Sequence, residues 1–159
     1  MRFVDLWQMP GQKSYVLFQV SVLETFESYR QSSLASTEAG GVLLGYVRAG
    51  HLEVIQATPP QAEDVRHRVR YERNDPTHQA LADLMWKESE GGVRYLGEWH
   101  THPEDRPTPS GVDIIGWRHR ASQRQDARAT LGVIVGRVAL YVSLVDKHGH
   151  IEICNEQGA

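Results

Sequence analysis

The sequence predicts a mixed α/β domain, in which a single mixed β-sheet of about six to eight strands is flanked by three helices. Short apolar runs typical of strands are interspersed with segments whose apolar residues recur at helical spacing. Glycine and proline punctuate the boundaries between these segments. The length of 159 residues suits one core, so we expect a single domain over residues 1–159.

The first part of the chain is expected to form a helix followed by a hairpin. Val22, Phe26 and Tyr29 recur at helical spacing, directly after a mostly apolar stretch that suits a strand. Ala49-Gly50 separates two further apolar runs and suits a turn. The expected elements are a strand beginning near residue 16, a helix over about 21–33, and strands over 39–47 and 51–57.

The middle of the chain is expected to form a loop, a short strand and a second helix. Residues 58–64 contain two prolines and suit a loop, and residues 67–71 suit a strand. Asp75-Pro76 is typical of a helix start, and Gly91-Gly92 of a helix end. The apolar residues predicted to form the buried stripe of this helix are Leu81, Leu84 and Met85.

The last third is expected to form a strand, a helix and three more strands. Residues 93–102 suit a strand that leads into a proline-rich loop. Thr108-Pro109 suits a helix start, and the helix is expected to continue to about Arg124. Its predicted buried face contains Ile114, Trp117 and Ala121. The final strands are expected at 131–135, 138–145 and 151–153, with a turn at 146–149.

Composition excludes several classes of function. The 17 Lys+Arg against 20 Asp+Glu give a formal net charge of -3, which provides no electrostatic case for a nucleic-acid or anionic-membrane partner. Cys154 is the only cysteine, so it cannot form an internal disulfide or a Cys-based zinc site, and we expect it to be a small buried apolar residue. Neither a membrane span nor a signal peptide is apparent, which favours a cytoplasmic protein.

The most informative segment is the sequence H-T-H-P, which begins at His100 and is followed by Ser110 and Asp113. His100 and His102 have the same parity at the end of a strand, so both imidazoles can point to one side. Ser110 and Asp113 are three residues apart near a helix start, so they lie on one helical face. Two imidazoles and a carboxylate would leave a fourth tetrahedral position for water, as in a catalytic zinc site.

The H-x-H pair alone is weak evidence, because a chain with 8 histidines contains one by chance about 0.4 times. Requiring Pro103, Ser110 and Asp113 at fixed offsets lowers the chance expectation to about one in 10⁴. The second pair, His148-Gly149-His150, has no serine or carboxylate at matching offsets. We therefore expect it to be a solvated hairpin tip.

The residues alone leave the general base open. Glu98 has the same parity as His100, while Glu104 and Asp105 lie in the loop that follows. Glu38 is distant in sequence but precedes an apolar strand that the sheet could bring to the site. A base must come within hydrogen-bond reach of the attacking water, and sequence spacing does not determine that geometry.

These motifs resemble those of the JAB/MPN/JAMM zinc metalloprotease family, most closely its compact prokaryotic branch. The family pattern is a glutamate ahead of an early strand, followed by H-[ST]-H-P-x₆-S-x-x-D. Here Glu38 precedes the strand at 40–45, and the histidine motif begins at His100. The resemblance covers about residues 20–145 and implies a cytidine-deaminase-like fold. One departure is Glu98, which stands where relatives often have an aromatic residue.

The resemblance implies roles for five residues. His100, His102 and Asp113 would hold one Zn²⁺ per chain. Glu38 would accept a proton from the activated water and pass it to the leaving amine. Ser110 would stabilise the tetrahedral intermediate through its hydroxyl. Such a site combines a metal that polarises the scissile carbonyl with an oxyanion donor.

The implied function is a zinc-dependent isopeptidase that hydrolyses the amide bond at the C-terminus of a ubiquitin-like protein or conjugate. A zinc peptidase acting on a small peptide or amino-acid adduct is the alternative with the same centre. A non-catalytic scaffold that binds partner subunits is the alternative from another class. Scaffold members of the family typically lose metal ligands, whereas this chain has all three.

Other candidate residues have ordinary structural explanations. Trp99 and Trp117 flank the motif and are expected in the core. Four arginines span a helix and the loop after it, and a solvated face is the favoured interpretation, with docking of an acidic partner as the alternative. These are Arg118, Arg120, Arg124 and Arg128.

Overall fold

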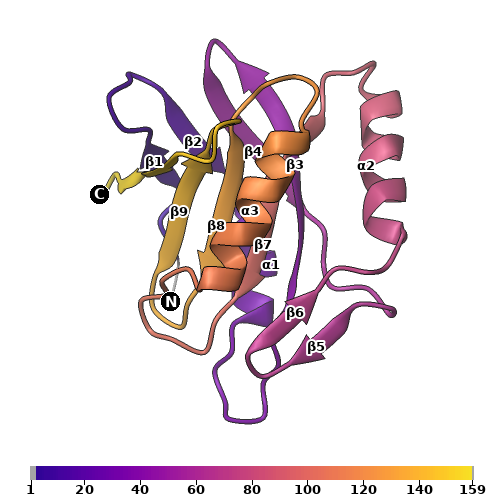
Figure 1. The fold of residues 1–159 in the computed structure, drawn as a ribbon, viewed down its shortest axis with the longest axis vertical. Helices are drawn as coiled ribbons and strands as arrows, with labels where there is room; N and C mark the ends of the chain where they lie inside the picture. The colour runs from indigo at the N-terminus through magenta and orange to yellow at the C-terminus, as the bar shows by residue number, and fades with distance from the viewer. Residues whose placement is uncertain (1–2, 159) are drawn as a thin grey trace.

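The computed structural model describes residues 3–158 and contains a nine-stranded mixed sheet (Figure 1). The strand order is β10-β9-β8-β7-β3-β4-β2-β1-β11. The bounds are β1 (Leu6–Gln8), β2 (Tyr15–Phe18), β3 (Gly40–Arg48), β4 (His51–Ala57), β7 (Arg94–Thr101), β8 (Thr130–Val135), β9 (Leu140–Val145), β10 (Ile151–Ile153) and β11 (Asn155–Glu156). A separate hairpin consists of β5 (Val65–His67) and β6 (Arg70–Glu72).

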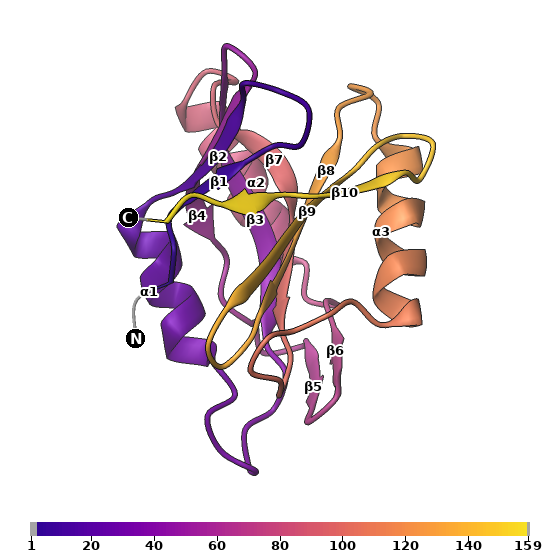
Figure 2. The ribbon, with the colours of Figure 1, turned by 90° about the vertical axis from the view of Figure 1, so that its left-hand side faces the viewer.

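Three helices cover the sheet: α1 (Val20–Tyr29), α2 (Thr77–Glu88) and α3 (Gly111–Gln123). Figure 2 shows α1 and α3 on opposite sides of the sheet. Alternation along β3 explains the two layers, because Leu43 packs in the core cluster with Phe26 of α1, whereas Val42 and Leu44 pack with Met85 of α2. The predicted mixed α/β class and the three helices are confirmed within residues 3–158, but the prediction of a single sheet is wrong, because β5 and β6 form a second, two-stranded sheet.

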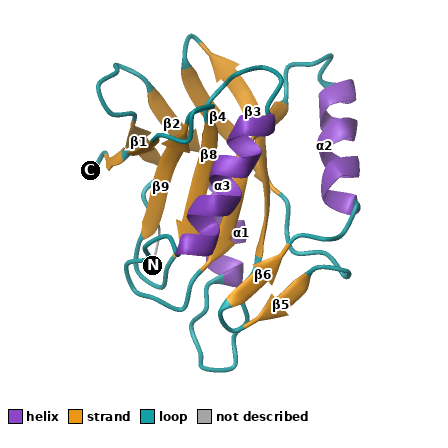
Figure 3. Cartoon of the chain, viewed as in Figure 1, coloured by secondary structure: helices purple, strands orange, loops and turns teal. Residues whose placement is uncertain are grey.

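The sheet is larger than the six to eight strands predicted. Its two outermost strands, β10 and β11, are separated in sequence only by Cys154, so the sheet curves until its two edges come close together. β1 and β11 contain three and two residues. Strands this short show no periodicity, so they could not be predicted from the sequence. The segment predicted as a strand at 67–71 instead contains the turn of the separate β5–β6 hairpin (Figure 3).

The predicted buried stripe of α2 was partly wrong. Leu84 is 50% exposed, whereas Met85 faces inward as predicted. The other inward residues are His78 and Ala82, seven and three residues before Met85. His78 is fully buried because both ring nitrogens are used: Nδ1 lies 2.7 Å from Thr58 Oγ1, and Nε2 lies 2.7 Å from Asp64 Oδ2. His78 is thus a polar residue on the inward face of α2, where the sequence pattern predicted apolar residues.

Other boundaries moved by one turn. The first helix ends at Tyr29 rather than near residue 33. The last helix begins at Gly111, because Ser110 forms the N-cap that Thr108-Pro109 was expected to provide. Of the helices the structure describes, none combines the length and apolarity needed to cross a membrane. Cys154 is buried, as expected.

Asp64 organises the hairpin and the start of α2. Its carboxylate accepts hydrogen bonds from five groups: the backbone N–H of Gln61, Asn74 and Asp75, the hydroxyl of Tyr71, and the ring of His78. Burial by itself would raise the pKa of Asp64, but these bonds lower it to about 2. The carboxylate therefore remains charged and ties the hairpin to α2.

We expect Asp64→Asn to lower the free energy of unfolding at pH 7 by about 2 kcal/mol, because a pKa depressed in the folded state stabilises it above the pKa of the unfolded chain. In the wild type this contribution is lost as pH falls from about 4 to about 2. Urea unfolding from pH 7 to pH 2 measures it. Asp83→Asn, which replaces an exposed carboxylate on α2, should leave the curve unchanged. Equal curves for wild type and Asp64→Asn would contradict the assignment.

Candidate metal centre and active site

The site forms where β7 ends and α3 begins. β7 lies between β3 and β8 near the middle of the sheet, so its last residues are fixed on both sides. Gly40 pairs with His100, and the N–H of Thr101 donates to the carbonyl of Ala39. Continuing this antiparallel register brings Glu38 opposite His102. Sheet pairing thus brings a glutamate from early in the chain to the histidine motif.

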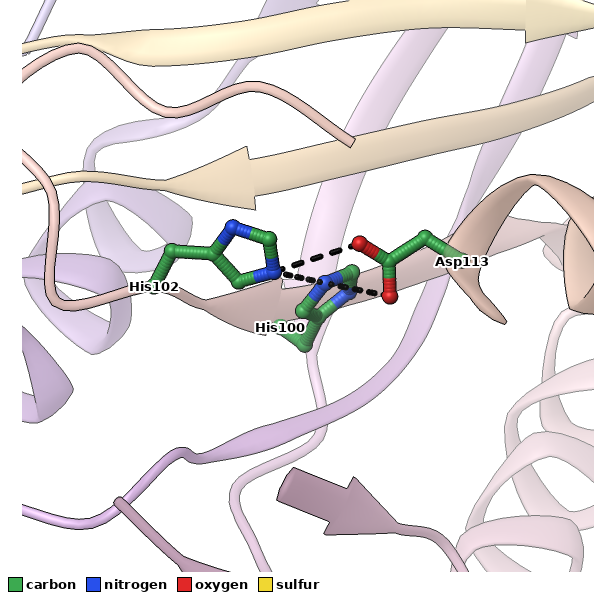
Figure 4. Close-up of side chains that lie close together, drawn as sticks. All are labelled: His100, His102 and Asp113. Atoms are coloured by element: carbon green, nitrogen blue, oxygen red, sulfur yellow. Dashed lines mark hydrogen bonds and ion pairs between the residues drawn. The ribbon is translucent and has the colours of Figure 1, made fainter. Parts of the chain in front are cut away.

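Three side chains converge at this point (Figure 4). His100 Nε2 and His102 Nε2 are 3.0 Å apart. Asp113 Oδ1 lies 3.2 Å from His100 Nε2, and Asp113 Oδ2 lies 3.2 Å from His102 Nε2. The structure therefore brings together the three residues predicted as metal ligands.

The donor set fits a divalent metal. Tetrahedral ligands at the usual zinc distances of about 2.0–2.1 Å are separated by about 3.3 Å. The two imidazole nitrogens are 3.0 Å apart and each lies 3.2 Å from a different oxygen of Asp113, and one ligand atom from each residue lies within 4.8 Å of the others. Two imidazole nitrogens that face each other can share only one proton, and a single cation would satisfy both. His102 Nδ1 is buried and has no hydrogen-bond partner among the described residues, although Glu104 Oε1 lies 3.2 Å away, where an outer carboxylate often orients a ligating imidazole.

Asp113 is held by the start of α3. Ser110 Oγ accepts from the N–H of Asp113 at 3.1 Å, and Asp113 Oδ2 accepts from the N–H of Ser110 at 2.8 Å, which makes a capping box. Burial opposes ionisation, but the bonds from His100 and His102 hold the pKa of Asp113 well below its usual range. The carboxylate is thus charged and aimed at the two imidazoles.

Glu38 is buried beside this group and keeps a proton more readily than an ordinary glutamate. Burial raises its pKa to about 7, although the neighbouring His102 acts in the opposite direction. Its backbone is fixed by the hairpin, because its N–H donates to the carbonyl of His67 and its carbonyl accepts from Arg66 Nε. A carboxyl with a pKa near neutrality suits a general base that must later release its proton.

The other carboxylates considered as bases are engaged elsewhere. Glu98 is paired with Arg73 and Arg120, and Asp105 is paired with Arg137. Glu104 contacts the outer nitrogen of His102 rather than the converging atoms. Glu38 is thus the candidate base that geometry favours.

The site opens into a cavity of about 790 Å³, whose lining includes the hairpin on one side and α3 on the other. Glu38, His100, His102, Ser110 and Asp113 all line it. Gly40 makes the hairpin wall possible, because a Cβ there would lie 2.5 Å from the ring of Tyr71. The same Cβ would lie 2.5 Å from the backbone carbonyl oxygen of Trp99, so Ala in its place would clash with both the tyrosine ring and β7.

Most of the residues that were predicted to have only a structural or solvent-exposed role have that role in the structure. Trp99 and Trp117 are buried in the core, and His148 and His150 are exposed at the turn between β9 and β10. Arg124 corrects the interpretation of a solvated arginine face, because its side chain is only 8% exposed. It forms five hydrogen bonds, to the carbonyls of Leu96, Tyr95 and Ala129 and to both oxygens of Asp126.

Sequence reasoning missed the residues that support the site from a distance. Thr58 accepts at Oγ1 from the N–H of Val42, and its carbonyl accepts from Trp99 Nε1. Together with Asp64 and His78 it connects β3, β7, α2 and the hairpin around the cavity. These residues are far apart in sequence and form no motif, so no pattern indicated them.

A His-His-Asp group at a strand end, with a buried glutamate beside it in one cavity, has the donor set of a metal-dependent hydrolase. Residues 24–151 match the family described as prokaryotic homologs of the JAB domain, and the chain belongs to this family. The family resemblance inferred from the motif is thereby confirmed.

Curated relatives carry a functional name. A Pseudomonas aeruginosa protein is 46% identical over 149 residues, covering 94% of each chain, and a Vibrio cholerae protein is 39% identical over 122 residues, covering 77% of this chain and 76% of the other. Both are named CD-NTase/cGAS isopeptidase. The solution structure of a Desulfitobacterium hafniense protein matches with a TM-score of 0.60 over 89% of each chain, and its 18% identity supports the fold alone.

Proposed function

We propose that this single-domain protein is a zinc-dependent isopeptidase. The observation that carries the proposal is the convergence of His100, His102 and Asp113 beside the buried Glu38 in one cavity of a JAB-family chain. The alternative of a non-catalytic scaffold would not require a complete donor set beside a carboxyl with a raised pKa.

His100, His102 and Asp113 would hold one Zn²⁺ per chain. When bound, the zinc would polarise the scissile carbonyl and make water acidic enough to lose a proton near pH 7. Asp113 would balance part of the cation charge, and its capping box with Ser110 keeps it aimed at the site. Glu104 would orient the ring of His102 through Nδ1.

Glu38 would take the proton of the attacking water and deliver it to the nitrogen of the departing lysine. Its raised pKa suits both transfers at neutral pH. Ser110 would donate a hydrogen bond from its hydroxyl to the oxygen that becomes negative in the tetrahedral intermediate. Its oxygen already accepts from the N–H of Asp113, which leaves the O–H free to donate into the cavity.

The substrate would be an amide bond between the C-terminus of a ubiquitin-like protein, or of a CD-NTase as the names of the relatives suggest, and a lysine. The direct test is to incubate the zinc-loaded protein with three substrates: a CD-NTase with a C-terminal extension, a ubiquitin-like fusion, and short linear peptides that contain no isopeptide bond. Cleavage of a protein substrate and not of the linear peptides supports the isopeptidase. Cleavage of the linear peptides alone supports the small-peptide alternative, and failure to cleave any of the three substrates contradicts the proposal.

Ser110 should have two separable roles. We expect Ser110→Ala to lower kcat about 10²-fold through loss of the oxyanion donor, and to lower the free energy of unfolding by about 1 kcal/mol through loss of the N-cap. Ser110→Gly costs an N-cap only about a few tenths of a kcal/mol and has no side-chain donor, so it should keep most of the stability and none of the rate. Steady-state kinetics and urea unfolding measure the two effects. A full rate in Ser110→Gly would contradict the oxyanion role.

A further inference from the structure

A second polar cluster lies in the cavity beyond the proposed metal centre. Glu98, at the position where family relatives often have an aromatic residue, points into the same cavity as His100 because the two residues have the same parity on β7. Arg73 contacts both carboxylate oxygens of Glu98, at 2.7 and 3.3 Å. Arg120 Nε lies 2.9 Å from Oε1, and the hydroxyl of Tyr95 donates to the same oxygen at 2.9 Å.

This cluster has an excess of positive charge. Two guanidinium groups share one carboxylate, so the cluster has a net charge of +1 in a partly enclosed cavity. The nearby Glu72 does not supply the missing charge, because it is paired with Arg70. One further carboxylate would balance the two arginines.

The guanidinium of Arg120 has N–H donors that are not used within the part of the fold that the structure describes. Its side chain is 41% exposed, and among residues 3–158 its guanidinium makes the ion pair with Glu98 and no hydrogen bond. Arg124 directly follows the last residue of α3 and is a structural arginine, because its side chain is buried and makes its hydrogen bonds within the fold. The difference indicates that Arg120 is available to a molecule in the cavity.

The position suits a substrate contact. Glu98 precedes His100 by two residues, about 7 Å along the strand. Arg120 follows Asp113 by seven residues, so it lies on the same face of α3, about 10 Å along the helix axis. An extended peptide covers such a distance in two or three residues. A substrate group bound by the arginines would thus lie on a residue within about three positions of the scissile bond.

We propose that Arg73 and Arg120, held in place by Glu98, form a carboxylate-binding subsite of the proposed isopeptidase. The ligand is a carboxylate of the substrate, either an acidic side chain near the scissile bond or a free α-carboxylate on the lysine side. Planar guanidinium groups recognise carboxylates through paired, charge-assisted hydrogen bonds. Because the subsite rests on the proposed function, its test includes a measurement that does not need turnover.

The kinetic test uses four isopeptide-linked peptides with the same acyl part. One has a lysine amide and no carboxylate, one has a lysine with a free α-carboxylate, and two have a lysine amide with a glutamate on either the acyl side or the lysine side. We expect the wild type to cleave at least one carboxylate peptide with a kcat/KM about tenfold above that of the neutral peptide. The preferred peptide identifies the source of the carboxylate.

The variant Arg120→Gln should reduce this preference to about twofold or less without changing the zinc content. Arg128→Gln removes the same charge from an exposed arginine outside the cavity and should keep the full preference. Fluorescence anisotropy with the metal-free proteins then compares binding of the preferred and neutral peptides. We expect the preferred peptide to bind the wild type about tenfold more tightly than it binds Arg120→Gln.

These two readouts separate failure of the subsite from failure of the proposed function. Zinc-dependent cleavage without a carboxylate preference, or a preference that survives in Arg120→Gln, overturns the subsite and leaves the isopeptidase standing. Carboxylate-selective, Arg120-dependent binding without any cleavage keeps the subsite and overturns the isopeptidase. If neither protein binds any of the peptides at millimolar concentration, the subsite is overturned as well.

Discussion

Replacing Glu38 with glutamine should lower kcat about 10³-fold while the protein retains about one zinc per chain. Glutamine has nearly the same size, so the buried position stays filled, but it cannot accept a proton from water. The raised pKa of Glu38 makes this the residue whose proton transfer matters most at neutral pH. Steady-state kinetics together with metal analysis measures both quantities on the same sample.

A matched control separates this effect from a general loss of charge. Glu63→Gln removes a carboxylate from the exposed loop ahead of the hairpin and should leave both kcat and zinc content unchanged. If Glu38→Gln keeps the full rate, the proton transfer described above is wrong. If it loses zinc along with activity, Glu38 supports the metal group rather than the chemistry.

The candidate metal ligands could be predicted from local sequence spacing, whereas the candidate base could not. His100, His102 and Asp113 lie within one strand, loop and helix start, so strand parity and helical spacing were enough to predict that they converge. Glu38 reaches them only because β3 pairs with β7, and no local pattern reports which strands pair. Without the family resemblance, Glu98, Glu104 and Asp105 were equally good candidates for the base.

The misassigned residues share one physical cause. Apolar periodicity finds a buried face only when that face is apolar, and α2 buries His78 through bonds to Thr58 and Asp64. Arg124 is buried in the same way, through bonds to backbone carbonyls at the end of α3. Tertiary hydrogen bonds therefore placed polar residues where the pattern predicted apolar or solvated ones.

The same network links the fold to the proposed chemistry. The hairpin that fixes the backbone of Glu38 is itself fixed by Asp64. Asp64 contacts His78, and His78 contacts the hydroxyl of Thr58. The carbonyl of Thr58 accepts a hydrogen bond from Trp99 Nε1. Trp99 is the residue next to His100 on β7. The base and the metal ligands are thus positioned by two routes, one through the sheet and one through the hairpin.

Of the two H-x-H pairs in the sequence, only His100 and His102 should be needed to bind the metal. We expect the double variant His100→Ala, His102→Ala to lose zinc, from about one per chain in the wild type to less than about 0.1. With two of three ligands removed, Asp113 alone offers a single carboxylate that cannot compete with water for the ion. Metal analysis after dialysis against a weak chelator measures the loss, and activity should fall with it.

The chain contains its own matched control in the exposed pair at the β9–β10 turn. His148→Ala, His150→Ala removes the same number of imidazoles at the same spacing, but these side chains have no partner like Asp113, and His150 Nε2 lies 3.8 Å from Glu152. This variant should retain all of its zinc and activity. Loss of zinc from the control and not from the first variant would move the metal to the turn. A wild type that takes up no added zinc would mean that the 3.0–3.2 Å convergence of His100, His102 and Asp113 is a hydrogen-bonded cluster, and the scaffold function would then fit better.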